Sequence, residues 1–286
     1  MNVQPLVSVL MTAYNRQDFI SEAIESVLAS TYTNWELIIV DDCSSDRTTD
    51  IARSYMIRDR RIKIYINEQN VGDYPNRNIA ASYAAGDYIM SVDSDDKIFE
   101  DGIENCVTLM QKFPNASLGI RLFNKQCEPF VISSEAVIRK HFFEEAMLHI
   151  GPGGTIIKRA FFFKINKYPV KYGPANDMYF NLKAACHTDV VMIPFEFLFY
   201  RRHEGQEINK KDKYLYNSYC YLKDALNELP LPLIKEKIHW LHLKNKRRFF
   251  VNVLKYFGST LDIAKTTHAI KQTKFGLKDA FQAIFQ

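Results

Sequence analysis

The first hundred residues alternate between short apolar runs and longer segments with helical periodicity, and this alternation constrains the fold more than any other feature. The apolar runs, which predict buried strands, span residues 6–11, 37–40, 62–66 and 88–92. The segments between them, which predict helices, span residues 17–30, 44–56 and 76–85. Strands and helices alternating at this spacing predict an α/β fold with a doubly wound, mostly parallel sheet and flanking helices.

After Asp93 the pattern is less regular. Further helices are predicted over residues 99–112 and 177–185, and further strands over 118–123, 154–157, 190–193 and 197–200. Strand signals stop near residues 205–215, and helical patterning follows to residue 286. We therefore expect an α/β domain in residues 1–210 and a basic, mainly helical region in residues 211–286.

Charge is unevenly distributed along the 286 residues. The net charge is +4, from 37 basic and 33 acidic residues, but residues 235–286 contain 11 Lys or Arg and only three acids. Residues 233–257 mix these cations with large apolar side chains at helical spacing. One interpretation is a helix lying on an anionic membrane surface. The other is a helix that packs on the body of the protein or on a second copy in a homo-oligomer. Nothing resembles a nucleic-acid-binding fold, so no nucleic-acid partner is expected.

The five cysteines are scattered, form no CxxC pair and are odd in number. A disulfide framework or a structural zinc site is therefore not expected, and a reducing compartment is favoured. The first residues lack the basic and then apolar pattern of a signal peptide. We expect a cytoplasmic protein, peripheral on the inner face of the cytoplasmic membrane if the basic region binds lipid.

Two predicted strands end in acidic residues: one in Asp41-Asp42, the other in Asp93-Ser94-Asp95-Asp96. A single acid at a strand end can cap the next helix, but three acids in four residues exceed that need. Crowded carboxylates repel one another unless a cation neutralises them, and Mg²⁺ or Mn²⁺ takes oxygen ligands. Because protein-bound Mg²⁺ commonly also contacts substrate phosphates, the cluster predicts a phosphorylated ligand, such as a nucleotide. The chain has no GxxxxGK[ST] motif and no GxGxxG after its first strand.

The sequence resembles family 2 glycosyltransferases with the GT-A fold. The resemblance is carried by VSVLMTAYNR (7–16), SVLASTYTNWELIIVDDCSSDRT (26–48), NVGDYPNRNIAASYAAGDYIMSVDSDD (70–96), GPANDMYFNLK (173–183) and FYRRH (199–203). These segments follow the order and spacing of the family across about residues 5–205. The resemblance implies a nucleotide-sugar donor, a Mn²⁺ or Mg²⁺ cofactor and transfer with inversion at the sugar.

The same resemblance implies roles for individual residues. Those assigned to donor binding are Thr12, Ala13, Tyr14, Asn15, Asp42, Arg77, Ser94, Asp96 and Arg202. For Tyr14 the alternative is a half-buried core aromatic, and for Arg77 it is a salt bridge to a local acid. Asp96 is either a third metal ligand or a partner of the ligands.

The resemblance assigns the metal to Asp93, Asp95 and His203, and the catalytic base to Asp177. A sugar hydroxyl is a weak nucleophile at neutral pH, so a carboxylate that takes its proton assists attack. For Asp177 the alternative role is a helix N-cap. Asn176 stands where the family usually has Glu, which could change how the acceptor is held.

Two loops have two interpretations each. Residues 204–213 are either a lid that orders over the donor or a flexible linker. The Gly-Pro-Gly-Gly segment at residues 151–154 is either a plain turn or a bare stretch of backbone that lets the acceptor approach.

Together, the residues and the resemblance predict an inverting, metal-dependent glycosyltransferase. It would move a sugar, from a UDP-sugar in the favoured case, to a hydroxyl of a glycan or lipid-linked acceptor in bacterial surface polysaccharide synthesis. Two alternatives remain: a sugar nucleotidyltransferase, and a non-catalytic sugar- or partner-binding protein on the same scaffold. The first would need a Gly-rich loop bearing Arg or Lys after the first strand, where the chain offers only Arg16.

Overall fold

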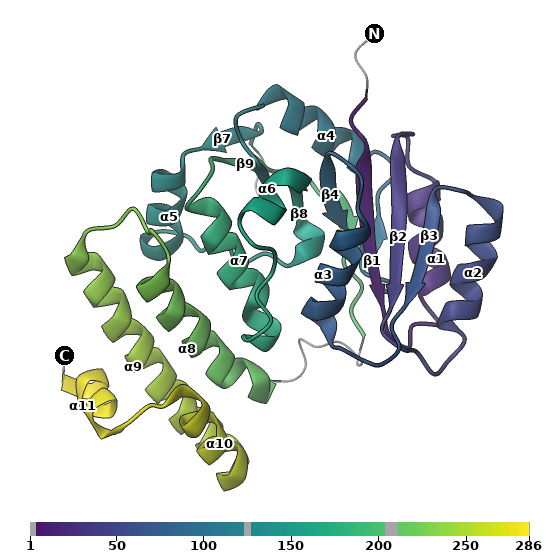
Figure 1. Ribbon diagram of the computed structural model, residues 1–286. Helices are drawn as coiled ribbons and strands as arrows, with labels where there is room; N and C mark the ends of the chain where they lie inside the picture. The colour runs from purple at the N-terminus through teal and green to yellow at the C-terminus, as the bar shows by residue number, and fades with distance from the viewer. Residues whose placement is uncertain (1–3, 123–126, 204–210, 286) are drawn as a thin grey trace.

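The computed structural model describes residues 4–122, 127–203 and 211–285, and its centre is an eight-stranded sheet with the order β3-β2-β1-β4-β8-β6-β9-β7 (Figure 1). The first half of this sheet is wholly parallel. Its strands are β1 (Val7–Ala13), β2 (Trp35–Asp41), β3 (Ile62–Ile66) and β4 (Tyr88–Ser91). The α/β fold predicted from the alternating pattern is confirmed.

The second half of the sheet mixes directions. Its strands are β6 (Leu118–Arg121), β7 (Phe130–Ile132), β8 (Thr155–Lys158) and β9 (Val190–Ile193). β8 runs antiparallel between β4 and β6, β6 pairs with β9 in parallel, and β7 closes the edge antiparallel to β9. The sheet is therefore mostly parallel, as predicted. One strand in the middle of the sheet, β8, runs antiparallel to both of its neighbours.

Helices cover both faces of the sheet, and the side chains of β2 show why. Leu37 and Ile39 belong to one buried cluster, whereas Ile38 and Val40 belong to the other, because successive side chains of a strand point to opposite faces. One cluster is completed by α1 (Ile20–Leu28), α2 (Thr48–Arg58) and α4 (Gly102–Lys112). The other is completed by α3 (Asp73–Tyr83), α5 (Ser134–Phe143), α6 (Arg159–Lys164) and α7 (Asn176–Ala185).

Sequence patterning missed several short elements. They are β5 (Lys97–Ile98), β7, α5, α6 and the 3₁₀ turns Pro152–Gly154 and Gly173–Ala175. β5 is two residues long and exists only because it pairs with β10 (Leu198–Phe199), a hundred residues later. Elements this short show no periodicity in their own sequence.

The region after residue 210 is helical, as predicted. Its helices are α8 (Lys211–Glu228), α9 (Lys235–Thr260), α10 (Ile263–Thr273) and α11 (Leu277–Phe285). Tyr221 and Leu222 of α8 and Leu241 of α9 join the same buried cluster as α7. The division at residues 210 and 211 stays a prediction. In the described part of the chain, none of the helices is both long and apolar enough to cross a membrane.

Gly86 fixes the start of β4, the strand that leads to the acidic residues. A Cβ at this position would lie 2.6 Å from the Leu6 carbonyl oxygen and 2.7 Å from the Ser8 backbone nitrogen. The Gly86 N–H also donates to Ser8 Oγ at 2.9 Å, and that hydroxyl donates to Glu36 Oε1 at 2.7 Å.

We therefore expect Gly86→Ala to lower the free energy of unfolding by about 1–3 kcal/mol, the usual cost of overpacking. Gly258→Ala is the matched control. Gly258 lies inside α9 with nothing within 4 Å of an added Cβ, and removing a helical glycine should stabilise by about 1 kcal/mol. Urea denaturation measures both. Equal stability of Gly86→Ala and the wild type would contradict this account of the β1–β4 junction.

Candidate active site

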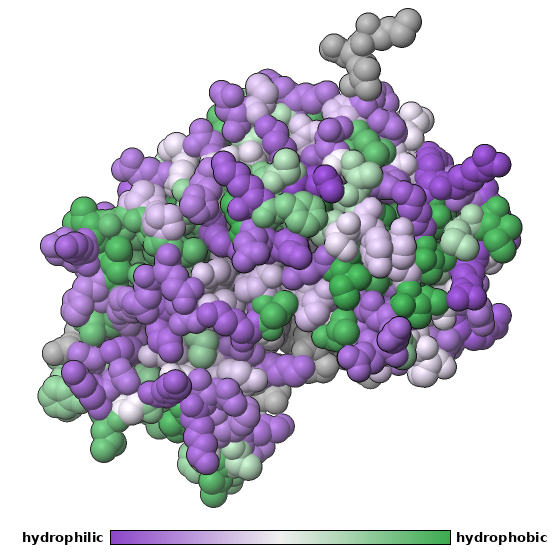
Figure 2. Space-filling view, viewed as in Figure 1, coloured by the Kyte–Doolittle hydropathy of each residue, from purple (hydrophilic) through white to green (hydrophobic). Residues whose placement is uncertain are grey.

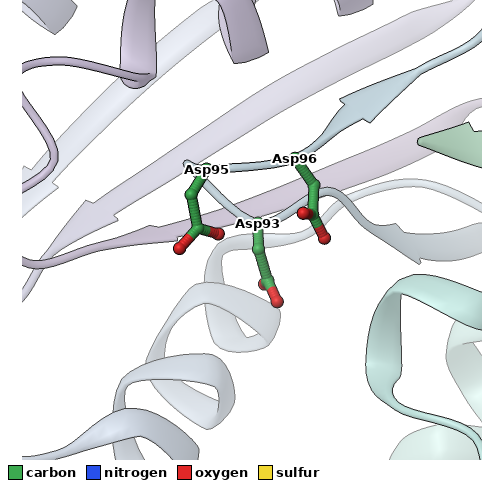
Figure 3. A group of neighbouring side chains, drawn as sticks. All are labelled: Asp93, Asp95 and Asp96. Carbon is green, nitrogen blue, oxygen red and sulfur yellow. The ribbon is translucent and has the colours of Figure 1, made fainter. Parts of the chain in front are cut away.

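Three carboxylates gather on the loop that follows β4. Oxygens of Asp93, Asp95 and Asp96 lie within 4.8 Å of one another, and Figure 3 shows their side chains on the same side of that loop. The cluster lies next to the end of β1, because the Ser94 hydroxyl donates to the Thr12 carbonyl oxygen at 2.8 Å. These are the acids that the sequence predicted at a strand end.

Asp93 is held by a two-pronged ion pair with Arg77 of α3. The Arg77 Nη1 and Nη2 atoms donate to the two carboxylate oxygens at 2.7 Å and 3.0 Å, and Arg77 Nε lies 2.8 Å from Asp73 Oδ1. Burial opposes the charge on the Arg77 guanidinium, but Asp73 and Asp93 outweigh it and hold the pKa of Arg77 above its usual value. The salt bridge weighed as the alternative role of Arg77 is therefore present, with an acid of the predicted metal site as its partner.

Asp95 faces two basic side chains. Arg16 Nε lies 3.0 Å and His203 Nε2 lies 2.9 Å from the same oxygen, Asp95 Oδ2. The ring of Phe19 stacks on the imidazole of His203 at 4.8 Å between centroids. The structure thus places His203 beside the acidic cluster, where a metal ligand would have to be.

The pairing of β5 with β10 explains how residues a hundred positions apart meet here. Phe199 lies opposite Lys97 in this small antiparallel sheet, so the residues that follow β10 run alongside the loop that follows β4. The Arg201 backbone N–H donates to Asp96 Oδ1 at 2.9 Å, and Arg201 Nε donates to the Asp95 carbonyl oxygen at 3.0 Å. Arg202, the residue assigned to the donor, is exposed.

Asp96 is the most buried acid of the cluster. Burial first, and then the neighbouring charges of Asp93 and Asp95, raise the pKa of Asp96 to about 7, against the lowering effect of the Arg201 N–H. The repulsion from Asp93 and Asp95 adds to the effect of burial on the pKa of Asp96. Hard divalent cations relieve such repulsion, so the donor set fits Mg²⁺ or Mn²⁺.

Asp177 lies in the first turn of α7. The N-cap of this helix is Ala175, so the alternative role of Asp177 as the N-cap is wrong; its Oδ1 accepts from the Met178 N–H at 2.7 Å. Burial, with a smaller effect of Asp73, raises the pKa of Asp177 to about 7, while the Met178 N–H, Arg77 and Tyr74 oppose the rise. A carboxyl poised near neutral pH is suited to take a proton.

Arg77 links Asp177 to the acidic cluster, because it pairs with Asp93 and also acts electrostatically on Asp177. Beside Asp177 the backbone is bare: a Cβ added at Gly151 would lie 3.8 Å from Asp177 Oδ2. The plain-turn interpretation of residues 151–154 holds for Pro152–Gly154, a 3₁₀ turn. The other interpretation, a bare stretch of backbone that lets the acceptor approach, applies to Gly151.

Asn176 closes the turn that precedes α7. Its amide oxygen accepts from the Tyr172 N–H at 2.9 Å, its amide nitrogen donates to the Gly173 carbonyl at 2.7 Å, and the residue is buried. The expectation that this Asn alters acceptor binding stays a prediction.

The predicted donor residues after β1 and β2 also lie together. Tyr14 is 47% exposed and belongs to neither of the two buried clusters that flank the sheet, so its ring is not part of that core. Asn15 has a positive φ of 52°, and its N–H donates to Ser44 Oγ at 2.8 Å. The carbonyl of the buried Ala13 accepts from the Asp42 N–H at 2.8 Å. These bonds join the loops that follow the two strands.

Asp42 is more enclosed than predicted. Its carboxylate accepts from Asn67 Nδ2 at 2.8 Å and from the Val71 and Gly72 N–H groups at 2.9 Å each. A carboxylate offers about four acceptor positions, so one remains for the N–H of a base.

Sequence reasoning missed Arg16, Arg201 and Asp73 as parts of this site. Arg16 had a detectable signal, because it stands directly after the TAYN segment that ends the first strand. Arg201 and Asp73 stand in segments that carry the family resemblance, FYRRH and NVGDYPNRN, but their contacts depend on partners that the fold supplies. Residues 204–210 of the proposed lid lie outside the described residues.

Comparison with known proteins agrees with this geometry. A family model described as glycosyl transferase family 2 matches residues 8–170. The chain belongs to glycosyltransferase family 2. The sequence is 42% identical over 111 residues to the putative teichuronic acid biosynthesis glycosyltransferase TuaG of Bacillus subtilis, covering 39% of this chain and 44% of that protein. It is also 42% identical over 107 residues to the UDP-Glc:alpha-D-GlcNAc-diphosphoundecaprenol beta-1,3-glucosyltransferase WfgD of Escherichia coli, covering 37% of this chain and 42% of that protein.

The alignments therefore span little more than two fifths of these family 2 relatives. Solved structures extend the likeness in fold to nearly the whole chain. S. aureus TarS 1–349 in complex with UDP-GlcNAc matches with a TM-score of 0.73 at 19% identity, covering 97% of this chain and 81% of that one. The mannosyltransferase PcManGT from Pyrobaculum calidifontis in complex with GDP-Man and Mn²⁺ matches with a TM-score of 0.66 at 15% identity, covering 99% and 88%. These matches confirm the predicted fold.

The partly buried Arg77–Asp93 pair should matter more for stability than an exposed pair. The Arg77 side chain is 10% exposed and that of Asp93 is 26% exposed, so Arg77→Met removes the buried cation beside partly exposed carboxylates and should lower the free energy of unfolding by about 1–3 kcal/mol. Arg139→Met, which breaks a half-exposed pair with Glu144, is the control and should cost about 0–1 kcal/mol. Chemical denaturation at neutral pH measures both. Equal effects of the two substitutions would refute the role given to Arg77.

Proposed function

We propose that this chain is an inverting, metal-dependent glycosyltransferase that moves a sugar from a nucleotide-sugar to a hydroxyl group of a glycan or lipid-linked acceptor. The observation that carries the proposal is the link between Asp177 and the cluster of three acids. Asp177 has a pKa of about 7, and Arg77 acts electrostatically on it and also pairs with Asp93 of the cluster. Asp177 fits the removal of a proton, and the three acids fit a divalent cation that would bind a diphosphate.

The proposed metal site consists of Asp93 and Asp95, with Asp96 and His203 beside them. When bound there, Mn²⁺ or Mg²⁺ would offset the negative charge that develops on the departing nucleoside diphosphate. Arg16, which now shares Asp95 with His203, is positioned to turn toward the phosphates once a cation takes over that carboxylate. A structural relative in complex with GDP-Man and Mn²⁺ supports this assignment.

Asp177 is the proposed catalytic base. Its carboxylate would take the proton of the acceptor hydroxyl while the hydroxyl oxygen bonds to the anomeric carbon and the bond from that carbon to the diphosphate oxygen breaks. Attack from the face opposite the leaving group inverts the anomeric carbon. The bare backbone at Gly151 leaves space for an acceptor next to Asp177 Oδ2.

The proposed donor site extends from the cluster across Thr12, Ala13, Tyr14, Asn15 and Asp42. The half-exposed ring of Tyr14 can stack on a base, and Asp42 can accept from an N–H of that base. The other residues proposed to bind the donor are Ser94, Arg77 and Arg202. UDP is the favoured nucleotide, in keeping with the TarS complexes with UDP and UDP-GlcNAc.

Bacterial surface polysaccharide synthesis is the proposed context, supported by relatives named for teichuronic acid biosynthesis and for transfer to a diphosphoundecaprenol-linked sugar. An acceptor of the second kind would be presented at the cytoplasmic face of the membrane. We propose that the chain acts there as a peripheral protein.

We expect Asp177→Asn to lower the rate of UDP release from a UDP-sugar by about a hundredfold or more, the scale of a lost general base. Asp50→Asn, at an exposed position in α2, is the matched control and should leave the rate unchanged. Release of UDP should require Mn²⁺ or Mg²⁺. Metal-independent release, or full activity of Asp177→Asn, would refute the proposal.

The pH profile provides a second readout. Because Asp177 has a raised pKa of about 7, its basic form predominates only above that pH. The value of kcat/KM should therefore rise roughly tenfold between pH 6 and pH 8, as the carboxyl loses its proton. Release of pyrophosphate from a nucleoside triphosphate would instead indicate a nucleotidyltransferase. Binding of a UDP-sugar without turnover would indicate a non-catalytic protein.

A further inference from the structure

One side of α9 is buried, although Trp240, Leu254 and Phe257 of the same helix are between 39% and 54% exposed. Leu241 packs into the main core, and Phe249 and Val253 pack against Tyr219 of α8. The buried side of this helix thus faces the body of the protein. Of the two interpretations of residues 233–257, packing on the body is present for one side of the helix, and the membrane interpretation stays a prediction for its exposed side.

The last described helix, α11, has its large apolar side chains on the side that faces away from the protein. Its Ala283 is buried, and Lys246 of α9 pairs with Asp279 at 2.8 Å and donates to Gln282 Oε1 at 2.6 Å. The small and polar side of α11 therefore lies against α9. Its large apolar residues, spaced at i, i+4, i+7 and i+8 on one side of a helix, are between 53% and 92% exposed: Leu277, Phe281, Ile284 and Phe285. We call these four residues the α11 apolar face.

The charge around this face is strongly positive. Residues 235–286 contain 11 Lys or Arg and three acids. Asp279 is paired with Lys246, and the Asp262 carboxylate accepts from the Lys265 N–H at 2.9 Å at the start of α10. Lys271 lies in the last turn of α10, Lys274 follows that helix, and Lys278 lies in α11. Figure 2 shows hydrophobic and hydrophilic side chains interspersed at the lower left of the molecule, where α10 and α11 lie.

We propose that the α11 apolar face inserts into the surface of an anionic phospholipid bilayer, with the surrounding cations contacting the lipid headgroups. A helix with an outward apolar face and a basic border has the two properties that interfacial binding requires. Charge selects this occupant over a second copy of the chain, because a two-fold interface at α11 would bring two such basic regions together. The proposal deepens the proposed function by naming the surface that would hold the enzyme at lipid-linked acceptors.

The test is co-sedimentation of the full chain with phosphatidylcholine vesicles that contain or lack phosphatidylglycerol. The wild type should bind the anionic vesicles, bind the neutral ones far less, and dissociate as salt rises, since each Lys or Arg near an anionic surface strengthens binding roughly fivefold. The double variant Phe281→Gln, Phe285→Gln should bind anionic vesicles at least about tenfold more weakly, because it removes apolar area from the interface. Both side chains are exposed, so the fold should persist, which thermal unfolding would check.

Ile57→Gln is the matched control. Ile57 is 83% exposed on α2, which lies on the opposite side of the molecule from α11 (Figure 1), and its substitution should leave vesicle binding unchanged. Equal binding to neutral and anionic vesicles, or unchanged binding by the double variant, would overturn the proposal. So would a lipid-free dimer, detected by light scattering, that the double variant dissociates.

Vesicle binding requires no nucleotide, so the two proposals fail separately. A chain that binds anionic vesicles through α11 but releases no UDP would refute the glycosyltransferase activity alone. A double variant that still releases UDP from a soluble donor shows that its loss of vesicle binding is not a loss of fold.

Discussion

The repulsion among Asp93, Asp95 and Asp96 is the constraint around which the site is built. Without a cation, the protein balances it with its own basic groups: Arg77 on Asp93, and Arg16 with His203 on Asp95. The balance is incomplete, since the pKa of Asp96 is raised to about 7. A divalent ion would complete this charge balance. The ion would also take the place of Arg16 at Asp95, which would release Arg16 for contact with an anionic ligand. The same charges that destabilise the loop thus make it a strong site for metal and diphosphate.

The fold meets this constraint with two devices. Parallel strands deliver the carboxylates to one edge of the sheet, where ligands bind in open α/β sheets. The short β5–β10 pair then brings residues 200–203 back across that edge, and the Arg201 N–H fixes Asp96. On the other side of Arg77, the start of α7 carries Asp177 with Gly151 beside it. Asp177 and the three acids therefore belong to one electrostatic unit although they come from distant segments of the chain.

The sequence was sufficient for the parallel half of the sheet, because each strand there has a buried apolar run and each helix a clear face. The acidic cluster was predictable because polar residues at strand ends are conspicuous, whereas Asp177 was assigned only from the resemblance to the family. The sequence could not reveal Arg201, Asp73 or the β5–β10 pair, whose roles arise from contacts between distant segments. It left residues 233–257 open between a membrane surface and packing on the protein, and it did not single out the exposed apolar side of α11, because only the packing shows which side of a helix is buried.

The most direct test of the central claim is a calorimetric titration of UDP in the presence and absence of Mn²⁺. If the acidic cluster holds a cation that in turn binds the diphosphate, UDP affinity should rise strongly with Mn²⁺, and Asp95→Asn should remove the gain. Equal affinity for UDP with and without Mn²⁺, or a gain that survives Asp95→Asn, would contradict the account.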